Sequence, residues 1–98
     1  MYNIKIGSRY DENLKTKDIA KLVKKEVKEI YKYIKIKTTT DYNMIRLDII
    51  FNDNYKDNYK EVLQHIRNIL NSYNYDGSEV EFDYSDNNFF DFINYEFI

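Results

Sequence analysis

Residues 33–51, YIKIKTTTDYNMIRLDIIF, decide the fold of this chain. Apolar and polar residues alternate at both ends of the stretch, as is typical of strands with one buried face. The alternating apolar positions are Ile34, Ile36, Ile45, Leu47, Ile49 and Phe51. Residues 38–43 between them are polar, and Asp41 and Asn43 are suited to a turn. The stretch therefore predicts an antiparallel hairpin.

An amphipathic helix is expected on each side of this hairpin. Residues 16–31 carry apolar side chains at a spacing of three and four, with Thr16 as the N-cap and Asp18 in the first turn. Residues 57–71 show the same spacing, and Asp57 or Asn58 would cap that second helix. Each apolar stripe must pack on another element, and a sheet is the obvious candidate.

Three more stretches fit strands. Residues 79–84 alternate cleanly, residues 89–98 form a last strand, and residues 2–6 fit an additional one. The sequence thus predicts a single α+β domain over residues 1–98, with two helices on one face of a small antiparallel sheet. The expected order is strand, helix, strand, strand, helix, strand, strand.

Composition restricts the class of protein. The 98 residues and the 43% hydrophobic content suffice for one modest core, and the absence of cysteine excludes disulfides and thiolate chemistry. No apolar run approaches the ~18–20 residues of a membrane span, and the start of the chain lacks the apolar segment of a secretory signal. We expect a soluble protein of the bacterial cytoplasm that does not bind membranes.

Residues suited to catalysis or metal binding are sparse. His65 is the only histidine and lies one position off the apolar stripe of the second helix, where a boundary residue is a simpler interpretation than a catalytic base. No phosphate-binding loop or nucleophile motif is present. The Asn/Asp runs at 52–57 and 83–88 lack the calcium-loop pattern and indicate turns. The prediction is a non-enzymatic protein without cofactor or metal.

Charge is strongly divided along the chain, although the net charge is only −2. Residues 15–37 hold nine lysines and three acids, whereas residues 71–98 hold seven acids and neither lysine nor arginine. Such asymmetry favours a charged partner.

The acidic strand is the first candidate binding site. Glu79, Glu81 and Asp83 are two residues apart, so they project from one face about 6.8 Å apart, which is about two axial steps of a nucleic-acid strand. Such a row could stand in for phosphates in a basic groove, with Asp86, Tyr73 and Tyr75 as further contacts. The alternative is a solvated strand face over a Phe-rich core.

The basic helix face is the second candidate. It comprises Lys17, Lys21, Lys24, Lys28 and Lys32, which share one side of the helix. Clustered lysines supply the sequence-independent part of nucleic-acid affinity. The net acidic charge and the presence of only three arginines favour the alternative of a solvated helix face.

Residues 16–28, TKDIAKLVKKEVK, resemble the first helix of a large polyvalent protein-associated domain, which opens with a Thr-x-x-x-Ala-Lys-Leu-Ile-Arg-Lys-like pattern. Residues 73–78, YNYDGS, are similar to the aromatic-Asp-Gly turn of that family. The resemblance covers residues 16–90 and departs at 41–44 and 51–54, where the family has Gly-Gly-Ser-Ser-like and Trp-Thr-Asp-Gly-Pro-like segments. It implies an accessory helix–hairpin–helix–strand module of phage, plasmid or conjugative elements, with no catalytic residues.

Charge and resemblance together predict a counter-defence inhibitor, similar to anti-CRISPR proteins, that offers the acidic strand to a basic host defence protein or nuclease complex. One alternative is a nucleic-acid-binding accessory module that uses the lysines of the first helix. Another is a homodimer or larger homo-oligomer in which the basic segment of one copy meets the acidic segment of the next.

Overall fold

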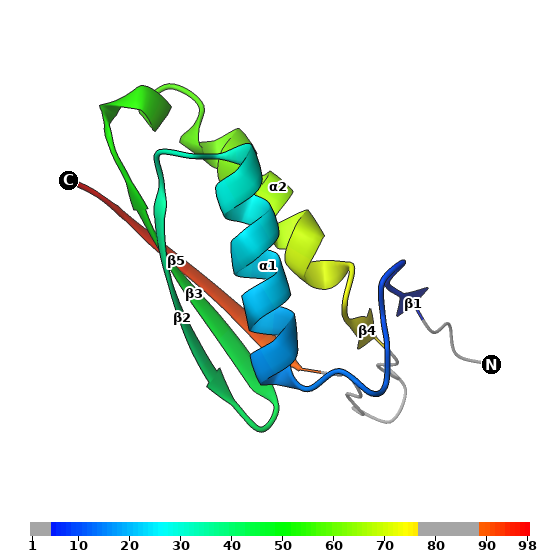
Figure 1. Ribbon diagram of the computed structural model, residues 1–98. Coiled ribbons are helices and arrows are strands. Elements are labelled where there is room, and N and C mark those ends of the chain that lie inside the picture. The colour runs from blue at the N-terminus through cyan, green and yellow to red at the C-terminus, as the bar shows by residue number, and fades with distance from the viewer. Residues whose placement is uncertain (1–4, 77–88) are drawn as a thin grey trace, which may run out of the picture.

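The computed structural model describes residues 5–76 and 89–98, and in it two helices lie on the same side of a three-stranded sheet (Figure 1). The helices are α1 (Thr16–Ile30), the short 3-10 turn η1 (Asp53–Tyr55) and α2 (Tyr59–Asn71). The strands are β1 (Lys5–Ile6), β2 (Lys35–Asp41), β3 (Met44–Phe51), β4 (Tyr75–Asp76) and β5 (Phe90–Phe97). The predicted α+β class is confirmed, whereas the predicted strand over residues 79–84 lies outside the described residues.

The β2–β3 hairpin is antiparallel and tighter than the sequence suggested. Asp41 pairs with Met44, so the turn consists of residues 42 and 43 alone. Residues 38–40, predicted as part of the turn, belong instead to β2. All three are threonines, and a β-branched residue fits a pleated strand well.

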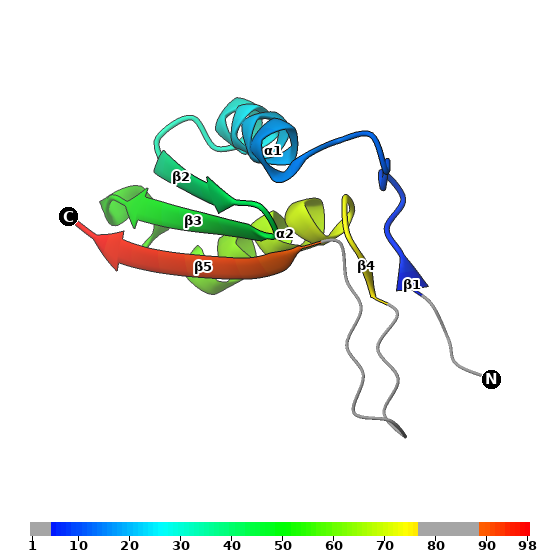
Figure 2. The same cartoon turned by 90° about the horizontal axis from the view of Figure 1, so that it is seen from below.

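The sheet is mixed rather than wholly antiparallel, because β5 runs parallel to β3, with Met44 opposite Phe90 and Phe51 opposite Phe97. After β3 the chain crosses the sheet through α2 before it returns, and such a crossover brings the next strand in parallel. Figure 2 shows the resulting order β2, β3, β5, with β5 at the outer edge. The short strands β1 and β4 pair separately and antiparallel.

The core lies between the helices and one face of the sheet. Its buried side chains include Ile19, Val23 and Val27 of α1, Ile45, Leu47, Ile49 and Phe51 of β3, and Val62, Ile66 and Leu70 of α2. The predicted alternation of β3 is therefore confirmed, since its four inward residues are all fully buried. Burial of these side chains is the main force that holds α1 against the sheet.

The helix starts differ slightly from the predictions. Lys15, not Thr16, occupies the N-cap position of α1, and the Asp18 carboxylate accepts a hydrogen bond from the Lys15 backbone N–H at 3.2 Å. The Thr16 hydroxyl instead donates to the Asp41 carbonyl at 2.6 Å, which ties α1 to the end of β2. Asn58, one of the two predicted caps, precedes α2.

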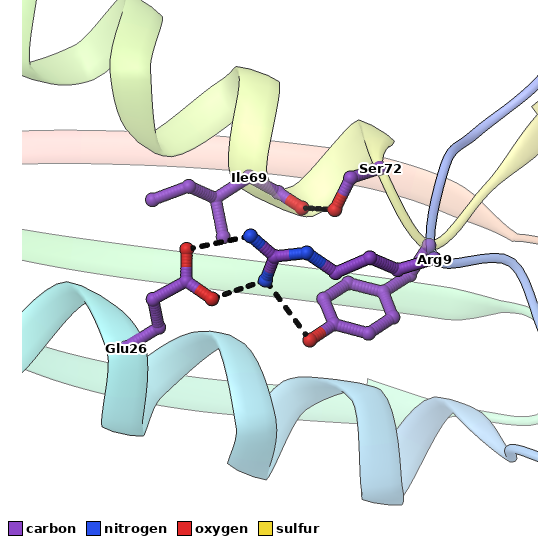
Figure 3. Close-up of polar contacts among 5 residues, drawn as sticks. Arg9, Glu26, Ile69 and Ser72 are labelled. Atoms are coloured by element: carbon purple, nitrogen blue, oxygen red, sulfur yellow. Dashed lines mark hydrogen bonds and ion pairs between the residues drawn. The ribbon is translucent and has the colours of Figure 1, made fainter.

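The N-terminal segment is fastened to both helices (Figure 3). The N–H of Gly7 donates to the Asn74 carbonyl at 2.8 Å, and that of Arg9 donates to the Ser72 carbonyl at 2.7 Å. The Arg9 guanidinium donates to both carboxylate oxygens of Glu26 on α1 and to the Tyr73 hydroxyl after α2. These contacts further raise the Arg9 pKa, with Glu26 as the main cause. Arg9 thus links α1 to the residues that directly follow α2.

Candidate nucleic-acid interface

The lysine face comprises Lys17, Lys21, Lys24, Lys28 and Lys32, of which the first four belong to α1 and Lys32 to the turn after it. Its side chains are exposed, apart from the partly buried Lys24. From Lys17 to Lys28 the helix rises about 16 Å, at 1.5 Å per residue. The structure therefore gathers Lys17, Lys21, Lys24 and Lys28 into one continuous stripe, whereas Lys32 lies beyond the end of the helix.

The contacts that hold α1 in place determine which way the lysine face points. Val23 and Val27 are completely buried against the sheet, and Glu26 binds Arg9 beside the end of α2. Residues two positions apart on a helix project about 200° from each other. Lys24 and Lys28 therefore point away from Arg9 and α2, toward solvent.

The acids of α1 lie beside the lysine face rather than within it. Asp18 stands three positions before Lys21 and Glu29 three before Lys32, whereas Glu26 has no lysine three or four positions away. Within the face itself only like charges stand side by side. Such an arrangement raises the local positive potential and attracts a polyanion.

The arginines form ion pairs with carboxylates, whereas the lysines of the described residues do not. Over residues 5–76 and 89–98 the ion pairs join Arg9 to Glu26, Arg46 to Asp48 at 3.2 Å, and Arg67 to Asp91 at 3.3 Å. Within those ranges no lysine forms an ion pair. The lysine ammonium groups are thus available to an external anion, whereas each arginine already has a carboxylate partner.

Most of the acidic candidate site lies outside the described residues, so the structure does not show whether its side chains lie together. Glu79, Glu81, Asp83 and Asp86 lie outside the described part of the chain, as does the side chain of Tyr75. Tyr73 is buried, with the Arg9 guanidinium 5.5 Å from its ring centre, so it is part of the core rather than a surface contact. The aromatic run beside this site divides, because Phe89 is fully buried while Phe90 and Phe92 are about half exposed.

His65 forms a polar pair at the helix surface. Its Nδ1 lies 2.6 Å from the Tyr31 hydroxyl, and the two rings meet edge to face. Burial raises the pKa of Tyr31, and the nearby Tyr55 and Glu61 add to the shift. The hydrogen-bond partner of His65 is therefore a tyrosine at the end of α1, whereas a catalytic histidine base is usually oriented by a carboxylate.

The described part of the chain offers few other candidates for a functional site. It contains no group of three His, Cys, Asp or Glu side chains placed to hold a metal ion, and no helix long and apolar enough to cross a bilayer. A shallow pocket of about 320 Å³ opens on the uncovered face of the sheet, lined in part by Arg46, Asp48 and Asn94. Arg46 and Asn94 both donate to Asp48, so these polar groups satisfy one another.

The edge strand β5 exposes aromatic side chains beyond the Phe89-Phe90-x-Phe92 cluster, which the sequence suggests as interface anchors beside the acidic strand. Its side chains Phe90, Phe92, Tyr95 and Phe97 are between 42% and 51% exposed. The signal in the sequence is the aromatic run itself, whose weak alternation does not predict which face of the strand is buried.

Comparison with family models, curated proteins and solved structures finds no match to this chain. The resemblance to a large polyvalent protein-associated domain therefore stays a prediction based on the residues that suggest it.

Proposed function

We propose that this chain is a non-enzymatic nucleic-acid-binding protein that holds a phosphate backbone against the lysine face of α1. The observation that carries the proposal is that four lysines share one face of α1, with Lys32 just after it, and form no ion pair within the described residues. Phosphates that replace their counterions with these ammonium groups release those ions, and this release drives binding.

The preferred partner is a double-stranded nucleic acid bound without regard to sequence. The 16 Å stripe spans about five phosphates of one strand, at about 3.4 Å of axial rise each. A lysine is a flexible point charge, and the stripe contains no arginine, asparagine or glutamine that could read base edges. The lysine face therefore provides backbone contacts that position the protein but do not specify a sequence.

The proposal is tested by fluorescence anisotropy with a labelled DNA duplex and an RNA duplex of the same sequence at low salt. The test variant is Lys21→Gln/Lys28→Gln, and the matched control is Lys56→Gln/Lys60→Gln, which removes the same charge from exposed positions after η1 and in the first turn of α2. We expect the test variant to bind at least about tenfold more weakly than the control. Equal losses in both variants, or no binding by the native chain, would contradict the proposal.

A second candidate function is inhibition of a host nuclease complex, in which the acidic C-terminal third occupies a basic nucleic-acid channel. The observation that favours it is that residues 89–98 carry exposed aromatics and acids but no lysine or arginine. Aromatic residues are enriched at protein interfaces. The resemblance to mobile-element modules supports a counter-defence role in the bacterial cytoplasm.

The inhibitor candidate is tested with the triple variant Glu79→Lys/Glu81→Lys/Asp83→Lys in nuclease assays against defence complexes of low-GC bacteria. Inhibition by the native chain that the triple variant loses would support this function. Inhibition that the triple variant retains would exclude these three acids as its cause.

A further inference from the structure

The outer edge of β5 carries backbone groups that β3 does not use. The N–H of Phe90 donates to the Asn43 carbonyl at 2.7 Å, and that of Ile98 donates to the Phe51 carbonyl at 3.1 Å. Because strand residues alternate, the even-numbered residues of β5 turn their N–H and C=O groups toward β3. Asp91, Ile93, Tyr95 and Phe97 therefore turn theirs to the opposite edge, where no strand among the described residues pairs with them.

The same strand concentrates the exposed apolar surface of the molecule. Nine large hydrophobic side chains are exposed among the described residues, and five of them lie in the last nine positions: Phe90, Phe92, Tyr95, Phe97 and Ile98. An eight-residue edge strand with exposed aromatics and no proline is a template for pairing with another strand.

We propose that β5 pairs antiparallel with β5 of a second copy of this chain, around a two-fold axis at Asn94. This register uses all four outward-facing residues of each copy, with Asp91 opposite Phe97 and Ile93 opposite Tyr95 across the axis. Any shift leaves at least one outward-facing residue unpaired. The product is a continuous six-stranded sheet in the order β2-β3-β5-β5-β3-β2 (compare Figure 2).

The charges of β5 agree with this register. Asp91 lies opposite Phe97 and Glu96 lies opposite Phe92, so no carboxylate faces another, and like charges directly opposite would be destabilising. Pairing of β5 with the other edge, β2, would instead repeat head to tail into an open filament. The two-fold arrangement is closed and leaves β2 free.

The available area indicates a weak, reversible dimer. Four aromatic side chains of about 200 Å² each, about half exposed, together with Ile98 and the strand edge, offer at most about 600 Å² per copy. Stable complexes bury about 800 Å² per partner, and weak ones bury less. The dimer is thus expected at the lower limit of specific association, at concentrations of about 10 to 500 µM.

The dimer would present two lysine faces. A two-fold axis perpendicular to the sheet keeps the helices of both copies on one side, and α1 packs mainly over β2, the strand farthest from the seam. The inference goes beyond the proposed function and does not depend on it, because the seam contains none of the lysines.

Sedimentation equilibrium over this concentration range, at low and high salt, tests the proposal. Asn94→Lys places two like charges opposite each other at the axis, and the matched control Thr39→Lys adds the same charge to the same face of β2. Both side chains are exposed, and circular dichroism verifies that both variants fold. We expect a dimer that Asn94→Lys weakens at least about fivefold and that Thr39→Lys leaves intact.

Salt and hydrogen exchange complete the test. High salt screens the repulsion between the two acidic C-terminal thirds, so the dimer should be retained or strengthened. The amides of Asp91, Ile93, Tyr95 and Phe97 should become protected as concentration rises. The proposal is overturned if the protein stays monomeric at all concentrations, or if these amides are already protected in the monomer. It is also overturned if Asn94→Lys leaves the dimer unchanged, or if the dimer dissociates at high salt.

Discussion

Gly7 is a residue at which the N-terminal segment passes close to the backbone at the end of α2. A Cβ atom there would collide with the backbone carbonyl oxygens of Ser72 and Asn71, which cannot move without distorting the helix end. We expect Gly7→Ala to lower the free energy of unfolding by about 1–3 kcal/mol, as overpacking usually does.

The matched control for this substitution is Ser8→Ala, at an exposed neighbouring position, which should change stability by less than about 0.5 kcal/mol. Urea unfolding midpoints measure both effects. Equal midpoints for the two variants would show that the close approach at Gly7 imposes no constraint. The sequence could not predict this role, because the contact depends on residues more than sixty positions away.

Tyr31 gives the fold a dependence on alkaline pH. Burial raises its pKa above the ordinary value of 10.0, so the unfolded chain loses this proton first. The contribution of protonated Tyr31 to the free energy of unfolding is fully present below about pH 10, and it is lost as the pH rises through the folded-state pKa. Tyr31→Phe should therefore flatten the decline of the unfolding midpoint above about pH 10.

Tyr42→Phe serves as the control for the alkaline experiment, because the Tyr42 side chain is 94% exposed. Unfolding midpoints of both variants are measured from about pH 8 to about pH 11.5. An identical alkaline decline in Tyr31→Phe and the native chain would contradict the assignment.

At the scale of elements, two adjacent phenylalanines at the start of β5 have opposite environments. Phe89 is completely buried, whereas Phe90 is 47% exposed. We expect Phe89→Ala to destabilise the fold by about 3–5 kcal/mol through the cavity it leaves, and Phe90→Ala by less than about 1 kcal/mol. Thermal or urea unfolding of the two variants provides the comparison, and similar losses would mean that β5 is placed with the wrong face inward.

The sequence predicted the hairpin and both helices because their periods are strong. The alternation from Ile45 to Phe51 determined which face of β3 is buried, and the three–four spacing determined which face of α1 carries the lysines. The direction of β5 was not predictable in this way, since alternation alone does not distinguish a parallel from an antiparallel strand. The crossover through α2 sets that direction.

The sequence predicted which lysines form the candidate site, but not whether they are free of ion pairs. The spacing alone placed Lys17, Lys21, Lys24 and Lys28 on one side of α1. Their availability could not be predicted from the sequence, because Asp18 lies three positions before Lys21 and Glu29 three before Lys32, a spacing at which helical side chains can form ion pairs. In the structure no lysine of the described residues forms one.

At the scale of the whole molecule, the two proposed surfaces lie toward opposite edges of the sheet. The lysine face belongs to α1, which covers β2, while the β5 edge lies on the far side of β3. A phosphate backbone and a second copy could therefore bind at the same time. The dimer would present two lysine faces to one duplex and raise its apparent affinity without new contacts.

The central claim is that the lysine face binds phosphates, and its most direct test is the salt dependence of duplex binding by the native chain. Five lysine–phosphate contacts predict that log K falls against log salt with a slope of about −4.5 per bound chain. Lys21→Gln/Lys28→Gln should bring this slope to about −2.7, since two contacts are lost. A native slope near zero, or a slope unchanged in this variant, would contradict the claim.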